Sequence, residues 1–127
     1  MRLLDTNVAI HVRAGDPAVT SRVARLGEDV VISVLTRIEL EARGIVDVEQ
    51  AALHRARLRA FLAGFPVLPF DSEAADGYRA IIEAVGFSRR KIIDRMIAAQ
   101  AIAHGATLVT LNMADFADIP GLRLESW

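Results

Sequence analysis

Short apolar runs alternate with longer stretches of helical periodicity along the chain, and no other feature of the sequence limits its possible folds as strongly. The loops between the two kinds of segment are brief, which is typical of parallel strands connected through helices. Both faces of such a sheet are covered, so its strands are apolar throughout. We therefore expect an α/β fold with a parallel, five-stranded sheet flanked by helices, its strands at Arg2–Leu4, Val30–Ile32, Val67–Leu68, Thr107–Val109 and Gly121–Leu124.

The helical stretches are bounded by residues that begin or end helices. Asp71 is a typical N-cap, and Gly44, Gly64, Gly86 and Gly105 each follow the end of a helical pattern. One helix is expected directly after the turn at 5–7, and Phe87–Lys91 is expected to be a basic loop. The other expected helices are Ala18–Leu26, Leu35–Arg43, Val48–Ala63, the segment from Asp71 to Gly86, and Ile92–His104.

The size and composition of the chain exclude several classes of protein. A length of 127 residues without repeats or linker-like tracts predicts one domain, 1–127. The absence of cysteine excludes disulfides, thiolate nucleophiles and iron-sulfur clusters, and the three histidines do not have the spacing of a zinc site. With no membrane-spanning run and no signal peptide, we expect a cytoplasmic protein without membrane contact. Any metal would have to bind to oxygen ligands, as hard cations do.

Two acidic residues follow expected strands. Asp5 lies directly after the first strand, at the carboxyl edge where open parallel sheets bind their ligands. A lone Asp in this position also caps helices, and the sequence leaves both interpretations open. Asp115 follows the strand that ends at Val109, and Asn112–Asp115 could itself be a small capping arrangement.

Glu39 follows the second expected strand by one helical turn or two. It lies beside an apolar stripe, where a carboxylate needs a partner. The alternative is a capping box in which Thr36 caps the helix and Glu39 bonds back to its first turn. Ser33 is the better N-cap candidate, because it follows the strand directly.

Asp94 lies on a small, apolar helix face that should pack on the sheet. It shares this face with Ile97, Ala98 and Ala101, at offsets of three, four and seven residues. A buried carboxylate is retained only when it is paired, hydrogen-bonded or bound to a metal, and otherwise its pKa rises. The alternative is that Asp94 interacts with the backbone amides of its own first turn and with a neighbouring arginine.

The four acids taken together favour a metal site. In a parallel sheet their positions converge at one edge, and four carboxylates in one place repel one another unless cations neutralise them. Oxygen ligands select Mg²⁺ or Mn²⁺, which activate water for attack on a phosphodiester. The predicted ligands and catalytic residues are Asp5, Glu39, Asp94 and Asp115, and nearby polar residues that could orient water or phosphate are Asn7, Thr110 and Asn112.

Four segments of the sequence resemble the successive motifs of PIN-domain proteins. They are Leu3–Asn7, Ile32–Leu40, Asp94–Ala99 and Leu108–Phe116. Within that family the chain resembles the VapC toxins of bacterial toxin-antitoxin systems over its whole length. The resemblance implies a Mg²⁺- or Mn²⁺-dependent endoribonuclease that forms a homodimer and is inhibited by a VapB-type antitoxin. It also implies that Asp5, Glu39 and Asp94 are the central ligands and Asp115 the fourth acid.

Basic residues surround Asp94. Arg89, Arg90, Lys91 and Arg95 could grip RNA phosphates at the edge of the site, or could form a solvated loop and helix rim. Transfer RNA is a common target of similar toxins, but no motif in this chain encodes the choice of RNA.

Three other hypotheses compete with that of a metal-dependent ribonuclease. A PIN-like protein can act mainly as a binding module, in which case operator DNA would be contacted through the antitoxin, because this chain has no DNA-binding motif of its own. A dehalogenase-like phosphatase needs an Asp where Asn7 stands, and a receiver domain needs a strand-end lysine that is absent.

Overall fold

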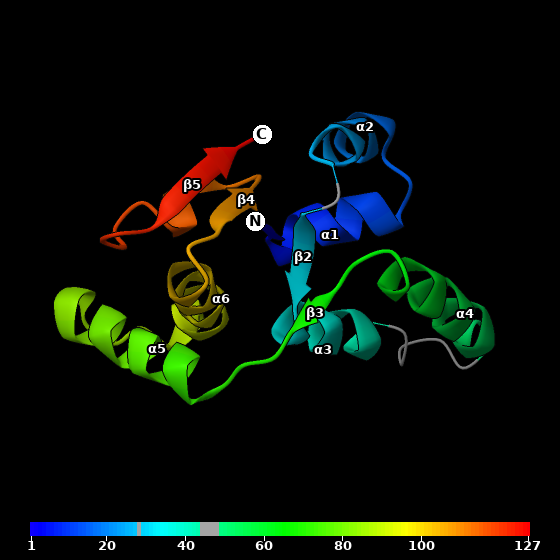
Figure 1. Cartoon of the computed structure of the whole chain (residues 1–127). Coiled ribbons are helices and arrows are strands. Elements are labelled where there is room, and N and C mark those ends of the chain that lie inside the picture. Colours follow the sequence, from blue (N-terminus) through cyan, green and yellow to red (C-terminus); the bar gives the residue numbers. More distant parts are fainter. Residues whose placement is uncertain (28, 44–48) are drawn as a thin grey trace.

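The computed structural model describes residues 1–27, 29–43 and 49–127, and its centre is a parallel sheet of five strands (Figure 1). The strand order is β3-β2-β1-β4-β5, so the first strand lies in the middle. This confirms the expected α/β class. The strands are β1 (Arg2–Leu4), β2 (Val30–Ser33), β3 (Val67–Leu68), β4 (Thr107–Thr110) and β5 (Arg123–Ser126).

The last strand lies two residues later than expected. Gly121 has a φ of 78°, a left-handed conformation that belongs to a turn and that glycine adopts without strain. The register then pairs Thr107 with Arg123 and Thr110 with Ser126. The expectation of a strand at Gly121–Leu124 was therefore wrong by the length of this turn.

Six helices of the described chain surround the sheet, and their N-caps follow the sequence closely. Asp16 and Asp71 cap α2 and α5, and the Ser33 hydroxyl accepts a hydrogen bond of 3.0 Å from the amide of Leu35. The expected start at Val48 and the stop at Gly44 lie outside the described residues. The helices are α1 (Thr6–Arg13), α2 (Pro17–Arg25), α3 (Val34–Ala42), α4 (Ala51–Leu62), α5 (Ser72–Val85) and α6 (Ile92–Ala103).

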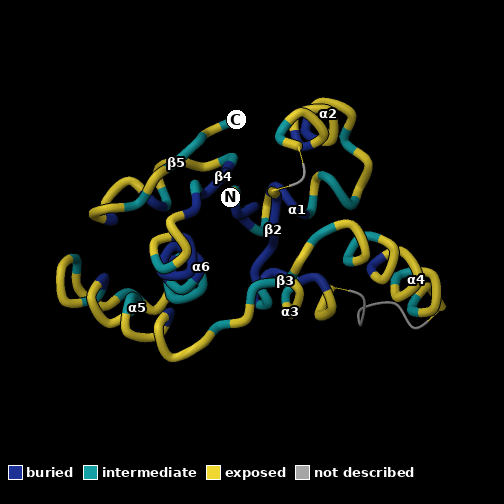
Figure 2. The backbone as a smooth tube through the Cα atoms, viewed as in Figure 1, coloured by how far each residue is buried: buried dark blue, intermediate teal, exposed yellow. Residues whose placement is uncertain are grey.

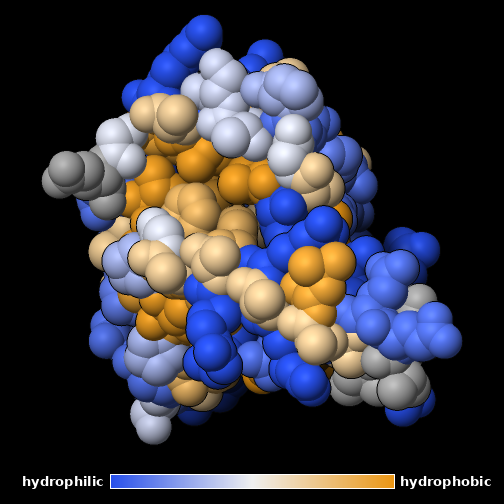
Figure 3. All heavy atoms as spheres, turned by 90° about the vertical axis from the view of Figure 1, so that its right-hand side faces the viewer, coloured by the Kyte–Doolittle hydropathy of each residue, from blue (hydrophilic) through white to orange (hydrophobic). Residues whose placement is uncertain are grey.

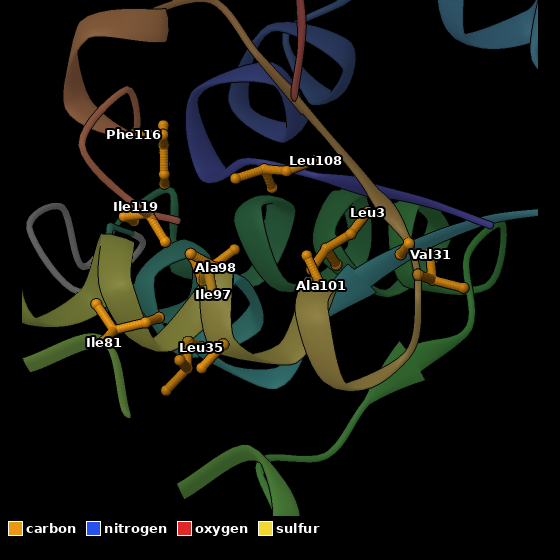
Figure 4. Close-up of a cluster of buried hydrophobic side chains, with 12 residues drawn as sticks. Leu3, Val31, Leu35, Ile81, Ile97, Ala98, Ala101, Leu108, Phe116 and Ile119 are labelled. Atoms are coloured by element: carbon orange, nitrogen blue, oxygen red, sulfur yellow. The ribbon is translucent and has the colours of Figure 1, made fainter. Parts of the chain in front are cut away.

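Adjacent residues of each central strand enter different cores, because successive side chains of a strand point to opposite faces. Leu3 and Leu108 pack with Ile97 of α6 in one cluster, part of which is drawn in Figure 4. Leu4 and Val109 pack on the other face with α1 and α2. The three central strands, β1, β2 and β4, are accordingly buried over almost their whole length (Figure 2). This burial fixes the strand ends, and with them the residues that follow.

Some apolar surface remains outside both clusters. Figure 3 shows the face that carries α2 and α4, where a band of apolar side chains lies among hydrophilic ones. Ile38 of α3 and Leu53 of α4 are 58% and 50% exposed. No helix in the described part of the chain is long and apolar enough to cross a membrane.

Candidate functional site

A cleft of ≈ 330 Å³ opens between the N-terminal part of α1, the C-terminal half of α3 and the first turn of α6. Both α1 and α3 follow their strands without a loop, so the carboxyl ends of β1 and β2 deliver their helices to the same edge of the sheet. Three of the predicted acids line this cleft. Its lining consists of Asp5, Thr6, Asn7, Ile10, Glu39, Ala42, Arg43 and Asp94.

Asp5 is buried at the floor of the cleft and is held at both carboxylate oxygens. Oδ1 accepts a hydrogen bond of 2.8 Å from the Thr6 amide, and Oδ2 accepts one of 3.0 Å from the Thr110 hydroxyl. Asp5 is thus the N-cap of α1 and a member of the acidic cluster at once, so the two interpretations do not exclude each other.

The environment of Asp5 favours its protonated form. Burial raises its pKa and is the largest cause of the shift, while the hydrogen bonds from Thr110 and Thr6 oppose it. The negative charges of Glu39 and Asp115 raise the pKa further. The Asp5 carboxylate therefore experiences the negative charges of these two acids.

Glu39 is not part of a capping box. Helix α3 begins at Val34 with Ser33 as its N-cap, so Thr36 is already inside the helix. The buried Thr36 hydroxyl instead lies 2.9 Å from the hydroxyl of Thr6 and ties α3 to the first turn of α1. The Glu39 carboxylate forms no hydrogen bond or ion pair with any described residue, and it faces the cleft.

Asp94 lies in the first turn of α6, and the face predicted from its spacing is confirmed. Ile97, Ala98 and Ala101 are all fully buried. Its carboxylate has no hydrogen bond or ion pair with a described residue, and Arg95 points elsewhere, so the alternative of a neighbouring arginine is wrong. The first interpretation, a carboxylate without a protein partner on a packed face, fits the structure.

The pKa of Asp94 is raised to about 6. Burial is the largest cause, and the negative charges of Asp5, Asp115 and Glu39 follow in that order. The positive charge of Lys91 opposes the shift. Burial and the repulsion from the three other acids thus act together to favour the protonated form of Asp94.

Asp115 stands outside the lining of the cleft and is connected to it through polar neighbours. Its Oδ2 accepts a hydrogen bond of 2.8 Å from the Asn112 side-chain amide, and the Asn112 backbone amide donates to the Thr110 hydroxyl at 3.0 Å. The expected helical turn is present as a short 3₁₀ helix, Met113–Asp115, with Asn112 at its N-cap position, but the Asn112 side chain bonds to the Asp115 carboxylate and makes no capping bond to a backbone amide. Asn7 is exposed and lines the cleft.

The donor set suits a hard divalent cation. All four acids offer oxygen, two of them lack any described protein partner, and their mutual repulsion is the kind that a cation relieves. No three His, Cys, Asp or Glu side chains among the described residues stand together as the ligands of one ion. Mg²⁺ itself typically binds through one or two carboxylates and completes its shell with waters and substrate phosphates.

Arg95 does not belong with the RNA-contacting candidates, which corrects the sequence-based expectation. Arg95 is only 3% exposed. Its guanidinium donates a hydrogen bond of 2.6 Å to the carbonyl oxygen of Gly86 and lies 3.3 Å from the Asp118 carboxylate. Lys91 lies 3.9 Å from the same carboxylate. Arg89 and Arg90 are exposed, in a short 3₁₀ helix where a loop was expected.

Three residues of the site were not predicted from the sequence. Arg43 follows Glu39 by four residues, so helical spacing could have placed both on one face. Thr6 and Thr36 form the hydroxyl pair described above. Nothing in the sequence signals this pairing, because it depends on how α1 and α3 pack.

Comparison with known proteins now decides the family, because residues 2–122 match the model described as the PIN domain. The chain belongs to the PIN domain family. This PIN domain is 35% identical to Ribonuclease VapC19 of Mycobacterium tuberculosis, over 97% of its length and 98% of the relative's. It is 30% identical to the tRNA(fMet)-specific endonuclease VapC of Shigella flexneri, over 98% and 96% of the two chains.

A solved structure has the same architecture as this PIN domain. It is the crystal structure of VapBC2 from Rickettsia felis bound to a DNA fragment from their promoter. The TM-score is 0.86 with 25% sequence identity, and the match covers 99% of this chain and 98% of the other. The five-stranded parallel sheet is thus the architecture of a PIN domain.

Proposed function

We propose that this PIN domain is a Mg²⁺- or Mn²⁺-dependent endoribonuclease and the toxin of a type II toxin-antitoxin pair. The observation that carries the proposal is the cluster of four mutually repelling carboxylates at the edge of the sheet, with the pKa of Asp94 raised to about 6. The names of two relatives, a ribonuclease and a tRNA-specific endonuclease, support RNA as the substrate.

Asp5, Glu39 and Asp94 would hold the cation, with Asp115 as the fourth acid. When bound, Mg²⁺ or Mn²⁺ supplies the positive charge that attracts a phosphodiester and makes water a nucleophile near neutral pH. Thr110 fixes the orientation of Asp5 through its hydroxyl, and Asn112 fixes that of Asp115. Asn7 lines the same cleft and is placed to orient water or phosphate.

The relatives also suggest partners and targets for this chain. Structured cellular RNA, with transfer RNA as one candidate, is the proposed substrate, and a VapB-type antitoxin is the proposed inhibitor. A homodimer is part of the same proposal. Arg89, Arg90 and Lys91 remain candidates for contacts with RNA phosphates, because the first two are exposed beside α6.

Cleavage of total cellular RNA by antitoxin-free protein tests the proposal. The protein is incubated in Mg²⁺, in Mn²⁺ and in EDTA, and new RNA ends are mapped by sequencing. Asp94→Asn removes the central charge, and Asp76→Asn on α5 is the matched control, since Asp76 is exposed and pairs only with Arg79 at 3.7 Å among described residues. We expect metal-dependent cleavage at few sites, retained in Asp76→Asn and lost in Asp94→Asn and in EDTA.

A second candidate function follows from the DNA-bound VapBC2 neighbour. In this alternative the chain is a catalytically weak module that reaches operator DNA only together with its antitoxin. Absence of cleavage above the Asp94→Asn background in either metal, combined with operator binding by the complex but not by the chain alone, would favour it.

A further inference from the structure

Three arginines gather beside the cleft without neutralising carboxylates. Arg43 lines the cleft together with Glu39 and Asp94. Arg13, at the end of α1, lies close enough to Arg43 and to Arg57 of α4 that its charge interacts with both. None of the three forms an ion pair with any residue that the structure describes.

Contacts among α1, α3 and α4 hold these arginines in place. His54 of α4 contacts the backbone carbonyl of Leu40 through Nε2 at 3.0 Å, which leaves Nδ1 to accept a hydrogen bond from the Arg13 guanidinium. Arg57 follows His54 by three residues and therefore lies on the same side of α4. Arg13 is thus held by a hydrogen bond, and all three arginines belong to the segments of α1, α3 and α4, which contact one another.

Arg13 is partly buried and experiences two neighbouring positive charges. Burial is the largest cause that lowers its pKa, and the charges of Arg57 and Arg43 lower it further. Its Nε atom is buried and has no hydrogen-bond partner among the described residues. Like charges brought together cost free energy that an anion recovers, and the planar guanidinium is well suited to phosphate.

We propose that Arg13, Arg43 and Arg57 form a phosphate-binding flank that holds the backbone of an RNA strand next to the carboxylate cleft. This inference rests on the proposed function. Helix α4 lies on the other side of the molecule from α5 and α6, between which Arg89–Lys91 lie (Figure 1). The strand is therefore held on both sides of the carboxylates, by the arginine flank and by the short basic helix.

RNA fits this flank better than an acidic protein does. A strand whose phosphodiester lies at the carboxylates carries further phosphates on both sides of it, and these reach the rim of the same cleft. An acidic peptide also carries negative charge, but it has no phosphodiester on which the carboxylate cleft could act. The position of the arginine flank next to the cleft therefore favours RNA as its ligand.

Salt-dependent binding of RNA tests the flank separately from cleavage. In the Asp94→Asn background, which prevents turnover, fluorescence anisotropy measures the affinity for a labelled bulk transfer RNA preparation at increasing salt. The variants are Arg43→Gln and Arg57→Gln. The matched control is Arg55→Gln, an exposed arginine on α4 about 200° around the helix from Arg57.

Loss of one phosphate contact makes the salt slope shallower by about 0.7–0.9 and weakens binding about five- to eightfold at about 0.1 M salt. We expect this for Arg43→Gln and for Arg57→Gln, and no change for Arg55→Gln. Equal slopes in all three variants would overturn the flank. So would Arg57-dependent binding of polyglutamate as tight as that of RNA, which would assign the flank to an acidic protein.

Cleavage by the otherwise wild-type protein separates this inference from the proposed function. If the protein cleaves RNA and Arg57→Gln leaves both KM and the salt slope unchanged, the flank is wrong and the ribonuclease stands. If the protein cleaves no RNA in either metal, the proposed function is wrong, and the binding slopes still decide whether the flank holds phosphate.

Discussion

The two sides of the carboxylate cleft are built in different ways. On the β1–β4 side, Asp5 and Asp115 are connected through Thr110 and Asn112 by hydrogen bonds of 2.8 to 3.0 Å. On the α3–α6 side, Glu39 and Asp94 have no such bond with any described residue. The first side is fixed by the protein itself, and the second carries charge that the protein leaves unsatisfied.

The hydrogen-bonded and the unbonded acids would contribute to cation binding in different ways. Hydrogen bonds that orient a ligand are the usual support of a metal site, so the β1–β4 side supplies a rigid reference. The unbonded acids supply the unfavourable repulsion that metal binding removes. Substitutions on the two sides should therefore have opposite effects on the stability of the metal-free protein.

The largest effect is expected for Asp94→Asn. RNA cleavage should fall by more than about 100-fold, since even the outer partners of metal ligands contribute 10- to 100-fold. The metal-free protein should become more stable by about 0.5–2 kcal/mol, as is common when a repelling group of a functional site is neutralised. Cleavage rates and urea unfolding in EDTA measure the two effects. If Asp94→Asn is less stable than the wild type, Asp94 has a structural role and its charge is not a source of unfavourable repulsion.

Thr110→Val should lower both the rate of RNA cleavage and the stability of the metal-free protein. The substitution keeps the shape of the side chain but removes the hydroxyl that donates to Asp5 and accepts from Asn112. We expect cleavage to fall about 10- to 100-fold and stability to fall by about 1–3 kcal/mol, because buried polar groups lose their partner. Thr110→Ser, which retains the hydroxyl, should recover most of the activity. If valine is tolerated as well as serine, the β1–β4 side is not held in the way described.

A smaller effect is expected in the pH dependence of stability. The pKa of Asp94 is raised from 3.8 to about 6 in the folded protein, so folding favours its protonated form. Its contribution to stability is complete below the unfolded pKa and is lost as the pH rises through the folded one. In EDTA, the wild type should lose stability relative to Asp94→Asn between about pH 4 and pH 6. Parallel unfolding curves for the two proteins over this window would contradict the assignment.

Much of this site could be predicted from the sequence because it depends on strand ends. The strands are short apolar runs, and Asp5 and Glu39 follow two of them at the edge where parallel sheets bind ligands. The spacing of Asp94 with Ile97, Ala98 and Ala101 also predicted the correct helix face. Periodicity and strand order depend on local patterns, which a single sequence contains.

Other features depend on packing between distant segments, and the sequence could not supply them. Arg95 is adjacent to Asp94, yet it is buried against Asp118 because it points to a different side of α6. The pairing of Thr6 with Thr36 and the gathering of Arg13 with Arg57 likewise require the positions of several helices. The strand β5 was misplaced because only the conformation of Gly121 reveals the length of the preceding turn.

The most direct test of the proposed metal site is to locate a bound cation in the carboxylate cleft. Crystals of the protein soaked in Mn²⁺ would be measured for anomalous scattering, with Asp94→Asn crystals as the control. The account predicts an anomalous peak in the cleft among Asp5, Glu39 and Asp94 that is lost or greatly weakened in the variant. A cleft without a peak at saturating Mn²⁺, or a peak that is equally strong in Asp94→Asn, would contradict it.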